Sequence, residues 1–416
     1  MAGHDPSCRA SSPVRIAMAV CPKMAPMRSF SRRAGNIKQS GIREVTRRIE
    51  AVGGVNLGQG TCALPPHPAV LAAAHRALDA GHNSYTFFDG VRPLKEAIAW
   101  RYGRYNDLNI APEHVLVTAG ATGGLECACK VFLDEGDEVV LFEPIYQYHV
   151  RLVEERGAIP RLVRLQSPDW TFDPAELERA FSPRTKLLVF ANPNNPTGKV
   201  FTREELLTIG DACRRHGVVA VSDEVYEYIL SEGHRHLSLA ALPGMFDHTL
   251  TLSSASKTLF VTGWRVGWVV GPPDILQPLG VKSDETYVCA PAPLQYAVAE
   301  ALRLDDSFFE GLRTPFLRRR DRLCAALRAA GLTPQTPAGA YYVLAGYEGL
   351  RYGSDQDAMM GLIERAGVGS VAGVEFFPSE GARGRSTGLL RFCFALTDDL
   401  LESGCERLVR QSLEAR

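Results

Sequence analysis

Hydrophobic and polar positions follow two periodicities along most of the chain. From residue 115 onward, short apolar runs of strand length alternate with longer stretches whose apolar positions recur at helical spacing. The runs are too apolar to leave one face in water, which is typical of parallel strands covered by helices on both faces. The predicted strands are VLVT (115–118), EVVLF (138–142), RLVRL (161–165), KLLVFA (186–191), VVAVSD (218–223), TLTLS (249–253) and RVGWVV (265–270).

Helices are predicted between these strands from their periodicity and their end signals. They cover LECACKVFL (125–133), DPAELERAF (173–181) and TREELLTIGDACRRHG (202–217). The second and third each open on a capping residue, and the third closes on glycine. Strands and helices in alternation predict a large doubly wound α/β domain with a mostly parallel sheet.

The C-terminal part of the chain has a different order of elements. From about residue 308, a long arginine-rich amphipathic helix leads into three strand-like runs and a terminal helix. This mixture predicts a second, smaller α+β domain. The three runs are AYYVLA (340–345), VGSVA (368–372) and LLRFCFA (389–395).

Residues 1–35 differ from the rest of the chain. They carry five arginines and one lysine, with Asp5 as the one acid, among prolines and serines, and this composition cannot build a hydrophobic core. We expect a disordered basic tail or a start codon assigned too early, with Met27 as the true start. A transit peptide, which is also arginine-rich and poor in acids, is the alternative.

Composition excludes several classes of partner. The 46 basic and 47 acidic side chains nearly cancel, which gives no general attraction for nucleic acid. No apolar run approaches the ~20 residues that span a bilayer. The ten cysteines form no CxxC pair, which favours a reduced, cytoplasmic location. His234 and His236 are expected on a surface loop, and we predict no metal site.

Polar side chains follow several of the predicted strands, where open α/β sheets bind their ligands. AGATGG (119–124) could hold an anion on free N–H groups, although it lacks the spacing of a dinucleotide or P-loop motif. In NPNNPTGKV (192–200), Asn194 or Asn195 could aim an amide at a ligand. A plain surface turn would have a similar sequence, so both interpretations stay open. Asp223 is either a helix cap or the partner of a buried cation.

Lys257, in SASK (254–257), is the most informative of these residues. Most lysines are solvated surface groups, but this one follows a buried strand and precedes Arg265 by eight residues. Pyridoxal phosphate requires a lysine for its aldehyde, a cradle for its phosphate, a carboxylate for its ring nitrogen and a phenol. The strand ends of this sequence offer all four.

NPNNPTG, DEVY, SxSK and GWRVGW, in this order, resemble the fold-type-I class I/II aminotransferases over residues 36–416. The resemblance implies a PLP-dependent transferase fold and a homodimer with shared active sites. It also implies an N-terminal arm (36–60) associated with the small domain, a large PLP-binding domain (61–305) and a small C-terminal domain (306–416). The sequence is most similar to the kynurenine aminotransferase or glutamine transaminase K branch, in VNLGQG (55–60), SYTFFDG (84–90), LPGMFDHTLT (242–251) and LRFCFA (390–395).

The same resemblance implies catalytic roles for three residues. Lys257 would form the Schiff base and move a proton, with a lowered pKa. Asp223 would keep the pyridine nitrogen protonated, and Tyr226 would hydrogen-bond the ring hydroxyl together with Asn195. Arg391 would bind the substrate α-carboxylate, near Asn195 and the Gly60 backbone. The remaining cofactor contacts implied are Gly120, Ala121, Thr122, Ser254 and Arg265 on the phosphate, Tyr146 stacked on the ring, and Tyr85 reaching the neighbouring subunit's phosphate.

The sequence leaves the substrate and the reaction open. Val288 and Cys289 replace aromatic and histidine groups of kynurenine aminotransferase, and Ile42 lies near the position of its stacking tryptophan, which argues against kynurenine. The charges of REVTRRIE (43–50) and KSDET (282–286) leave glutamine, methionine, aspartate or a basic amino acid as substrates. Transamination is predicted, with a lyase or an enduracididine- or capreomycidine-type cyclase as alternatives. A PLP-binding transcription regulator is disfavoured because the N-terminal tail is too short for a DNA-binding domain.

Overall fold

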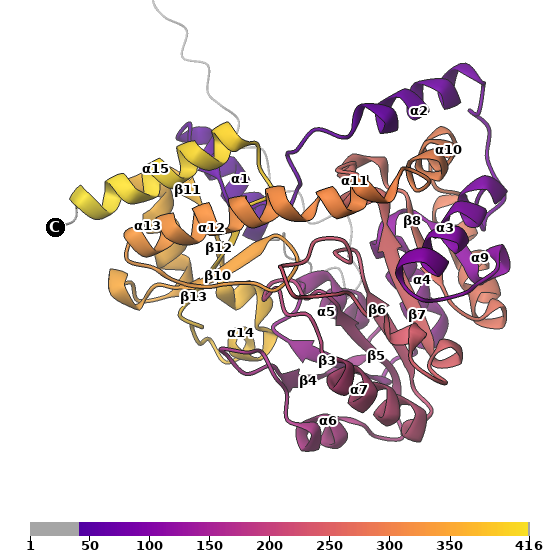
Figure 1. The fold of residues 1–416 in the computed structure, drawn as a ribbon. Helices are drawn as coiled ribbons and strands as arrows, with labels where there is room; N and C mark the ends of the chain where they lie inside the picture. The colour runs from indigo at the N-terminus through magenta and orange to yellow at the C-terminus, as the bar shows by residue number, and fades with distance from the viewer. Residues whose placement is uncertain (1–40, 415–416) are drawn as a thin grey trace, which may run out of the picture. The chain divides into compact units, whose positions relative to one another are not determined.

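The computed structural model describes residues 41–414. Its centre is a seven-stranded sheet in the order β2-β8-β7-β6-β5-β3-β4 (Figure 1). Each predicted strand of the large domain is present, with ends within a few residues of those expected. The strands are β2 (Val115–Thr118), β3 (Glu138–Glu143), β4 (Ile159–Arg164), β5 (Thr185–Ala191), β6 (Val219–Asp223), β7 (Thr249–Ser254) and β8 (Gly267–Val270).

The sheet is mostly parallel, with one exception to the prediction. Strands β7, β6, β5, β3 and β4 pair with parallel neighbours, whereas β8 is antiparallel to both β7 and β2. The expectation of a parallel strand at 265–270 was therefore wrong. The connection from β7 to β8 holds only the four-residue helix α8 (Ala255–Thr258) and a short 3₁₀ turn. A parallel crossover needs a longer helical connection.

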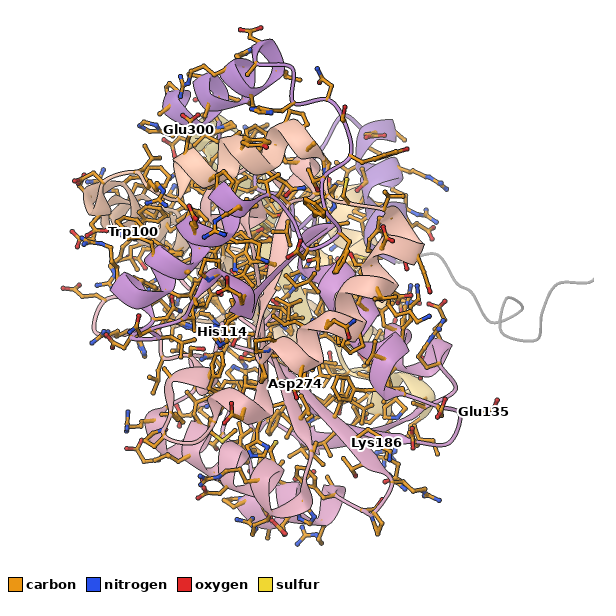
Figure 2. The ribbon with its side chains drawn as sticks, turned by 90° about the vertical axis from the view of Figure 1, so that its right-hand side faces the viewer. Trp100, His114, Glu135, Lys186, Asp274 and Glu300 are labelled. Atoms are coloured by element: carbon orange, nitrogen blue, oxygen red, sulfur yellow. The ribbon has the colours of Figure 1, made fainter. Side chains whose placement is uncertain are left out.

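Helices cover both faces of this sheet. Successive side chains of β3 point to opposite faces of the sheet. Val139 and Leu141 belong to the core that includes α4 and α9. Val140 and Phe142 belong to the core that includes α7. His114 and Lys186 mark the amino ends of β2 and β5 in Figure 2. The helices of this part are α2 (Pro68–Asp79), α3 (Arg92–Tyr105), α4 (Gly120–Phe132), α5 (Gln147–Glu155), α6 (Pro174–Ala180), α7 (Arg203–His216), α9 (Pro273–Tyr287) and α10 (Ala292–Ala301).

The predicted helix ends are formed by the expected caps. The Asp173 carboxylate accepts from the backbone N–H of Ala175 at the start of α6. Thr202 and Glu205 form a capping box on α7, and Gly217 ends that helix with a φ of 64°. Local sequence therefore fixes the two helices that lie between β4 and β6.

The C-terminal part forms a smaller, antiparallel sheet with strands in the order β12-β13-β10-β9. The run 368–372, expected as one strand, divides at Ser370 into β11 and β12, which belong to different sheets. The elements are α11 (Asp306–Gly311), α12 (Arg313–Ala329), β9 (Thr333–Gln335), β10 (Tyr342–Gly346), α13 (Asp355–Ala366), β11 (Val368–Gly369), β12 (Val371–Ala372), α14 (Pro378–Ala382), β13 (Leu389–Cys393) and α15 (Asp398–Glu414).

The beginning of the described chain packs against this smaller sheet. Helix α1 (Gly41–Ala51) buries Val45 and Ile49 against Ile363 of α13, and β1 (Val55–Asn56) pairs in parallel with β11. The division into domains at residues 61 and 306 stays a prediction, and the expected tail 1–35 lies outside the described residues. Among the described helices, none is long and apolar enough to cross a membrane.

Candidate active site

A cavity of about 660 Å³ lies at the carboxyl ends of three neighbouring parallel strands. Ala191, Asp223 and Ser254 are the last residues of β5, β6 and β7, and all three line it. Asp223 is in register with Ala191 on one side and with Leu252 of β7 on the other. The sheet therefore places the carboxylate of Asp223 at the cavity between two neighbouring strand ends, as expected for an open α/β sheet.

Asp223 has a partner that the sequence did not indicate. Its Oδ2 lies 2.9 Å from Nε2 of His149, whose side chain is buried on helix α5. The other ring nitrogen of His149 has no partner among the described residues. The histidine thus orients the carboxylate. Within the described part of the chain, Oδ1 accepts only a long bond of 3.4 Å from the Val225 N–H, which leaves it for a further group.

Lys257 extends from the short helix α8 across the cavity. Its Nζ donates to the Gly60 carbonyl at 3.1 Å and lies 5.8 and 5.5 Å from the ring centroids of Tyr226 and Tyr341. Burial lowers the pKa of Lys257 to about 8, because an ammonium loses hydration there. Only about a tenth of the amine is therefore unprotonated at pH 7, compared with far less for an ordinary solvated lysine.

Helix α4 and Arg265 form an anion cradle beside the lysine. Gly120 begins α4 with a φ of +76°, and a Cβ at this position would lie 2.3 Å from Nη2 of Arg265. The glycine therefore permits the guanidinium to approach the helix N-terminus. Arg265 is held by the carbonyls of Thr262 and Ala119, at 3.1 and 3.3 Å. Free N–H groups and a guanidinium together suit a phosphate.

Two serines from SASK complete this cradle. The Ser254 hydroxyl accepts from the Ser256 N–H at 3.2 Å and so caps α8. The Ser256 hydroxyl lines the cavity, is buried and has no hydrogen-bond partner among the described residues. A buried hydroxyl that has no protein partner and lines a cavity is free to bond a ligand there. Ser256 is therefore a candidate site residue beyond those predicted.

Arg391 is a buried cation with no carboxylate partner among the described residues. Its Nη1 donates to Oδ1 of Asn195 at 3.0 Å, its Nη2 donates to the Gly58 carbonyl at 2.9 Å, and its Nε bonds to none of residues 41–414. The guanidinium carbon lies 4.2 and 4.5 Å from the ring centroids of Tyr342 and Phe376. Neutral contacts hold its position without cancelling its charge, so the site favours an anion.

Two phenols, Tyr226 and Tyr342, line the cavity together with Lys257 and Arg391. The hydroxyls of Tyr226 and Tyr342 lie 3.0 Å apart. Burial raises the pKa of Tyr342 to about 12 and that of Tyr226 well above its usual value, so both remain protonated donors at neutral pH. A Cβ on Gly60 would lie 2.3 Å from the Tyr342 hydroxyl, which explains the glycine at that position.

The structure gathers nearly all of the predicted site residues in one cavity. Gly120 lies against Arg265, but Tyr85 does not line the cavity and is 82% exposed. Val288 is also exposed, and the side chain of Ile42 lies outside the described residues. The predicted residues that line the cavity are Gly60, Ala121, Thr122, Tyr146, Asn195, Asp223, Tyr226, Ser254, Lys257, Arg265 and Arg391, and those not predicted include Arg47, Tyr148, His149, Ser256 and Tyr342.

The prediction that His236 lies on a surface loop was wrong. It is buried, and its Nε2 lies 2.8 Å from Oε2 of Glu224. Candidate metal-ligand atoms of Glu224, Glu227 and His236 lie within 4.8 Å of one another. Each carboxylate oxygen already accepts a hydrogen bond, from Ser222, Ser238 and His236 for Glu224 and from Ser253 and Asn106 for Glu227. These bonds tie the 223–228 segment to neighbouring parts of the chain.

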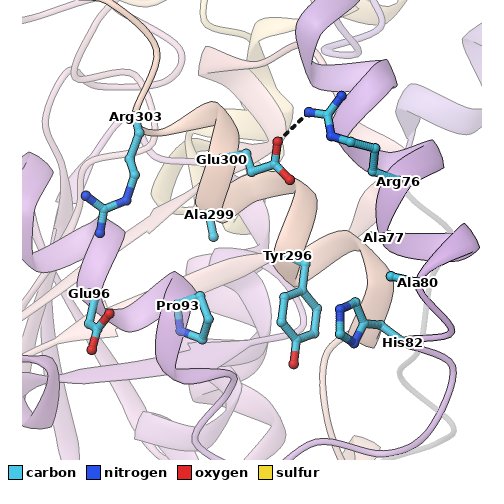
Figure 3. A pocket seen from close by; sticks show the side chains of 10 residues that line it. All are labelled: Arg76, Ala77, Ala80, His82, Pro93, Glu96, Tyr296, Ala299, Glu300 and Arg303. Atoms are coloured by element: carbon cyan, nitrogen blue, oxygen red, sulfur yellow. Dashed lines mark hydrogen bonds and ion pairs between the residues drawn. The ribbon is translucent and has the colours of Figure 1, made fainter.

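A second hollow, of about 360 Å³, lies among α2, α3 and α10 (Figure 3). His82 stacks on Tyr296 with ring centroids 3.7 Å apart, and Arg76 forms an ion pair with Glu300 across its rim. None of the predicted site residues lines this hollow. The residues predicted to bind cofactor or substrate thus gather at the larger cavity and not at this hollow.

Comparisons with known proteins agree with this arrangement. The family model described as aminotransferase class I and II matches residues 52–408. Rat kynurenine–oxoglutarate transaminase 3 is 34% identical over 94% of this chain and 92% of its own length. The probable N-succinyldiaminopimelate aminotransferase of Mycobacterium tuberculosis is 35% identical over 88% of this chain and 94% of its own.

Solved structures give the same result. N-succinyldiaminopimelate aminotransferase from Mycobacterium tuberculosis superposes with a TM-score of 0.87 at 33% identity, and covers 92% of this chain and all of its own (100%). A mutant aspartate aminotransferase of Thermus thermophilus has a TM-score of 0.84 at 32% identity, with the same coverage of 92% and 100%. The predicted fold and the predicted family are both confirmed. This chain belongs to the class I and II aminotransferases, with the fold-type-I architecture of PLP-dependent transferases.

Proposed function

We propose that this protein uses pyridoxal phosphate to move an amino group from an L-amino acid to a 2-oxo acid. The observation that carries the proposal is Arg391, a buried guanidinium that has no carboxylate partner within residues 41–414 and shares one cavity with Lys257 and Asp223. The relatives named above are aminotransferases, which favours transamination over elimination or cyclisation.

The donors in the cavity fit the phosphate of this cofactor. Ser256 offers a buried hydroxyl that no other described residue bonds, Arg265 offers a guanidinium, and α4 offers its first N–H groups at Gly120 and Ala121. These groups lie at the N-terminus of a 13-residue helix, whose dipole adds to the attraction for an anion. They would hold the phosphate and so fix the distance of the ring from Lys257.

The bound cofactor supplies an aldehyde for the amino group and a ring that withdraws electrons from the substrate Cα. Asp223, oriented by His149, would keep a proton on the ring nitrogen through its carboxylate. Tyr226 and Asn195 would donate to the ring hydroxyl, and Tyr146 would cover the ring face. A preorganised carboxylate of this kind stabilises charge as it develops in the transition state.

Lys257 would act first as the nucleophile toward the aldehyde and then as a proton carrier at its Nζ. Burial keeps its pKa near 8, which suits a base that must both accept and release a proton at neutral pH. Arg391 would hold the substrate α-carboxylate in a fork of two hydrogen bonds, with Asn195 fixing the guanidinium. The substrate Cα would then lie between the lysine and the cofactor.

The proposal includes a homodimer with shared sites. Tyr85 and Phe87 expose 82% and 83% of their surface, whereas aromatic side chains of a hydrophobic core are almost fully buried. Large exposed apolar side chains of this kind often mark an interface. Gln295 accepts from the Val91 N–H and donates to the Ala290 carbonyl, which ties this aromatic segment to the loop that begins at Val288. A second subunit would cover both segments and bring Tyr85 to the neighbouring cavity. A cytoplasmic location remains a prediction from the sequence.

Covalent trapping tests the cofactor proposal. The protein is incubated with pyridoxal phosphate, reduced with borohydride and cleaved, and the peptides are weighed by mass spectrometry. We expect the added mass on Lys257, and we expect Lys257→Ala to bind the cofactor without covalent label. A label spread over exposed lysines such as Lys186, or no label, would overturn the assignment.

A further inference from the structure

Tyr342 brings a phenol into the cavity to which the proposed function gives no role. It is the first residue of β10 and pairs with Cys393 of β13, and two residues on, Leu344 pairs with Arg391. Paired residues of an antiparallel sheet lie on one face, as do residues two apart in one strand. Tyr342 and Arg391 therefore share a face, and the guanidinium carbon lies 4.2 Å from the centre of the phenol ring.

The hydroxyl of Tyr342 reaches one of the proposed cofactor donors. It lies 3.0 Å from the hydroxyl of Tyr226, a residue 116 positions away in the chain. A Cβ at Gly60 would lie 2.3 Å from the Tyr342 hydroxyl but 3.2 and 3.4 Å from the nearest ring carbons. The glycine therefore leaves room mainly for the hydroxyl, and the structure accommodates a group that packing of the ring alone would not need.

The number of protons decides the direction of the bond between the two phenols once the cofactor is bound. A phenol has one proton to donate and can accept on its oxygen. In the proposed function Tyr226 donates that proton to the ring oxygen of the cofactor, so its own oxygen accepts from Tyr342. Asn195, the second proposed donor, is held in a similar way, because its Oδ1 accepts from Nη1 of Arg391 at 3.0 Å. Each donor to the ring oxygen thus has one supporting residue.

We propose that Tyr342 is a positioning residue that donates its proton to Tyr226 and so makes Tyr226 a stronger donor to the ring oxygen of the bound cofactor. This inference rests on the proposed function, because Tyr226 must hold that oxygen. Hydrogen bonds in a chain polarise one another, and each is stronger in a buried site of low dielectric constant. Tyr342 therefore acts through Tyr226 and not on the reacting atoms.

The absorbance of the lysine-bound cofactor reports on this chain of hydrogen bonds. Its colour changes when the proton shared between the cofactor's nitrogen and its ring oxygen is lost. A donor to that oxygen favours the loss, because the oxygen then carries its full negative charge. Removal of a donor should therefore raise the pH midpoint of the colour change. The midpoint is an equilibrium property of the bound cofactor and requires no turnover.

A pH titration of single and double variants tests the proposal. Tyr226→Phe removes the donor itself and should raise the midpoint by about one unit, a change of about tenfold in the acid dissociation constant. Tyr342→Phe removes only the support and should raise it by about half a unit, or roughly threefold. The double variant should match Tyr226→Phe, because Tyr342 acts through Tyr226.

The other titratable or charged groups around the two phenols remain in each of these variants, so the shifts report the hydroxyls. These groups are Asp223, Lys257, Tyr146, Tyr341, Arg391 and Cys393.

Tyr102→Phe is the matched control. Tyr102 and Tyr342 are each 2% exposed, but Tyr102 does not line the cavity, and its hydroxyl accepts from Nε1 of Trp268 at 3.1 Å. This variant should lower the stability to urea without moving the midpoint. If Tyr342→Phe does not fold, Tyr342→Met, which also lacks the donor, gives the same comparison.

Three results would overturn the role of Tyr342: an unchanged midpoint in Tyr342→Phe, single shifts that add in the double variant, or an equal shift in Tyr102→Phe. If Tyr226→Phe moves the midpoint and Tyr342→Phe does not, the proposed function stands and only the role of Tyr342 is lost. If the wild type shows no lysine-bound absorbance with pyridoxal phosphate, the proposed function falls and this inference falls with it.

Discussion

The cofactor-free protein should be destabilised by the charge of Lys257, and Lys257→Met measures that cost. Burial lowers the pKa of this lysine from 10.5 to about 8. Since one pKa unit corresponds to ~1.36 kcal/mol, the buried ammonium costs at most about 3 kcal/mol of the free energy of unfolding. Methionine has a similar length and no charge, so the variant avoids this cost.

The pH dependence follows from the direction of the shift. Below pH 8 the lysine is protonated in both the folded and the unfolded state, and the full cost is present. Between pH 8 and 10.5 the unfolded state binds more protons than the folded state, so the stability of the wild type rises relative to that of the variant. Above pH 10.5 the lysine is neutral in both states, and the cost is gone.

Urea unfolding of the cofactor-free proteins at several pH values provides the measurement. We expect Lys257→Met to gain up to about 3 kcal/mol relative to the wild type at pH 7, on top of any constant difference, and we expect the gain to disappear by about pH 10.5. Lys186→Met, which removes an exposed lysine of β5, serves as the control. A stability difference between wild type and Lys257→Met that is the same at every pH would refute the buried, depressed lysine.

Three further predictions concern the proposed cofactor site. Asp223→Ala should lower turnover by ~10²-fold or more, far more than Tyr226→Phe, because the carboxylate stabilises transition-state charge; equal losses would contradict these roles. Ser256→Ala should raise the dissociation constant of pyridoxal phosphate about tenfold, measured by absorbance titration, since a hydrogen bond to a charged group is lost; an unchanged constant would remove Ser256 from the site. Mixed subunits of Tyr85→Ala and Lys257→Ala should recover part of the activity that each homodimer lacks, and no recovery would argue against shared sites.

The sequence predicted the residues whose position follows from one local pattern. Asp223 and Lys257 come at or just after apolar runs, and in a parallel sheet such strand ends meet at one edge. The caps of α6 and α7 were predicted for the same reason, because they depend on neighbours within three residues. The resemblance to a family added Arg391, which lies far from the other residues in the chain.

Features that depend on distant partners could not be predicted. An apolar run carries no direction, so the antiparallel orientation of β8 became visible only from its pairing with β2 and β7. The bond between His149 and Asp223 joins residues 74 positions apart. His236 has a polar sequence context but is buried by the partnership of its ring with Glu224. Arg47 is one of several arginines on α1, and only the packing of Val45 and Ile49 places it at the cavity.

A single half-reaction tests the central proposal most directly. The cofactor-loaded enzyme receives one amino acid and no 2-oxo acid. If Lys257 carries the proton and Arg391 holds the α-carboxylate, the cofactor should change from its pyridoxal to its pyridoxamine form, with one 2-oxo acid released per subunit, and an added 2-oxo acid should restore the first spectrum. If every accepted amino acid instead leaves the cofactor in its pyridoxal form and yields ammonia with a lost side-chain group, or a cyclised amino acid, the protein is not an aminotransferase.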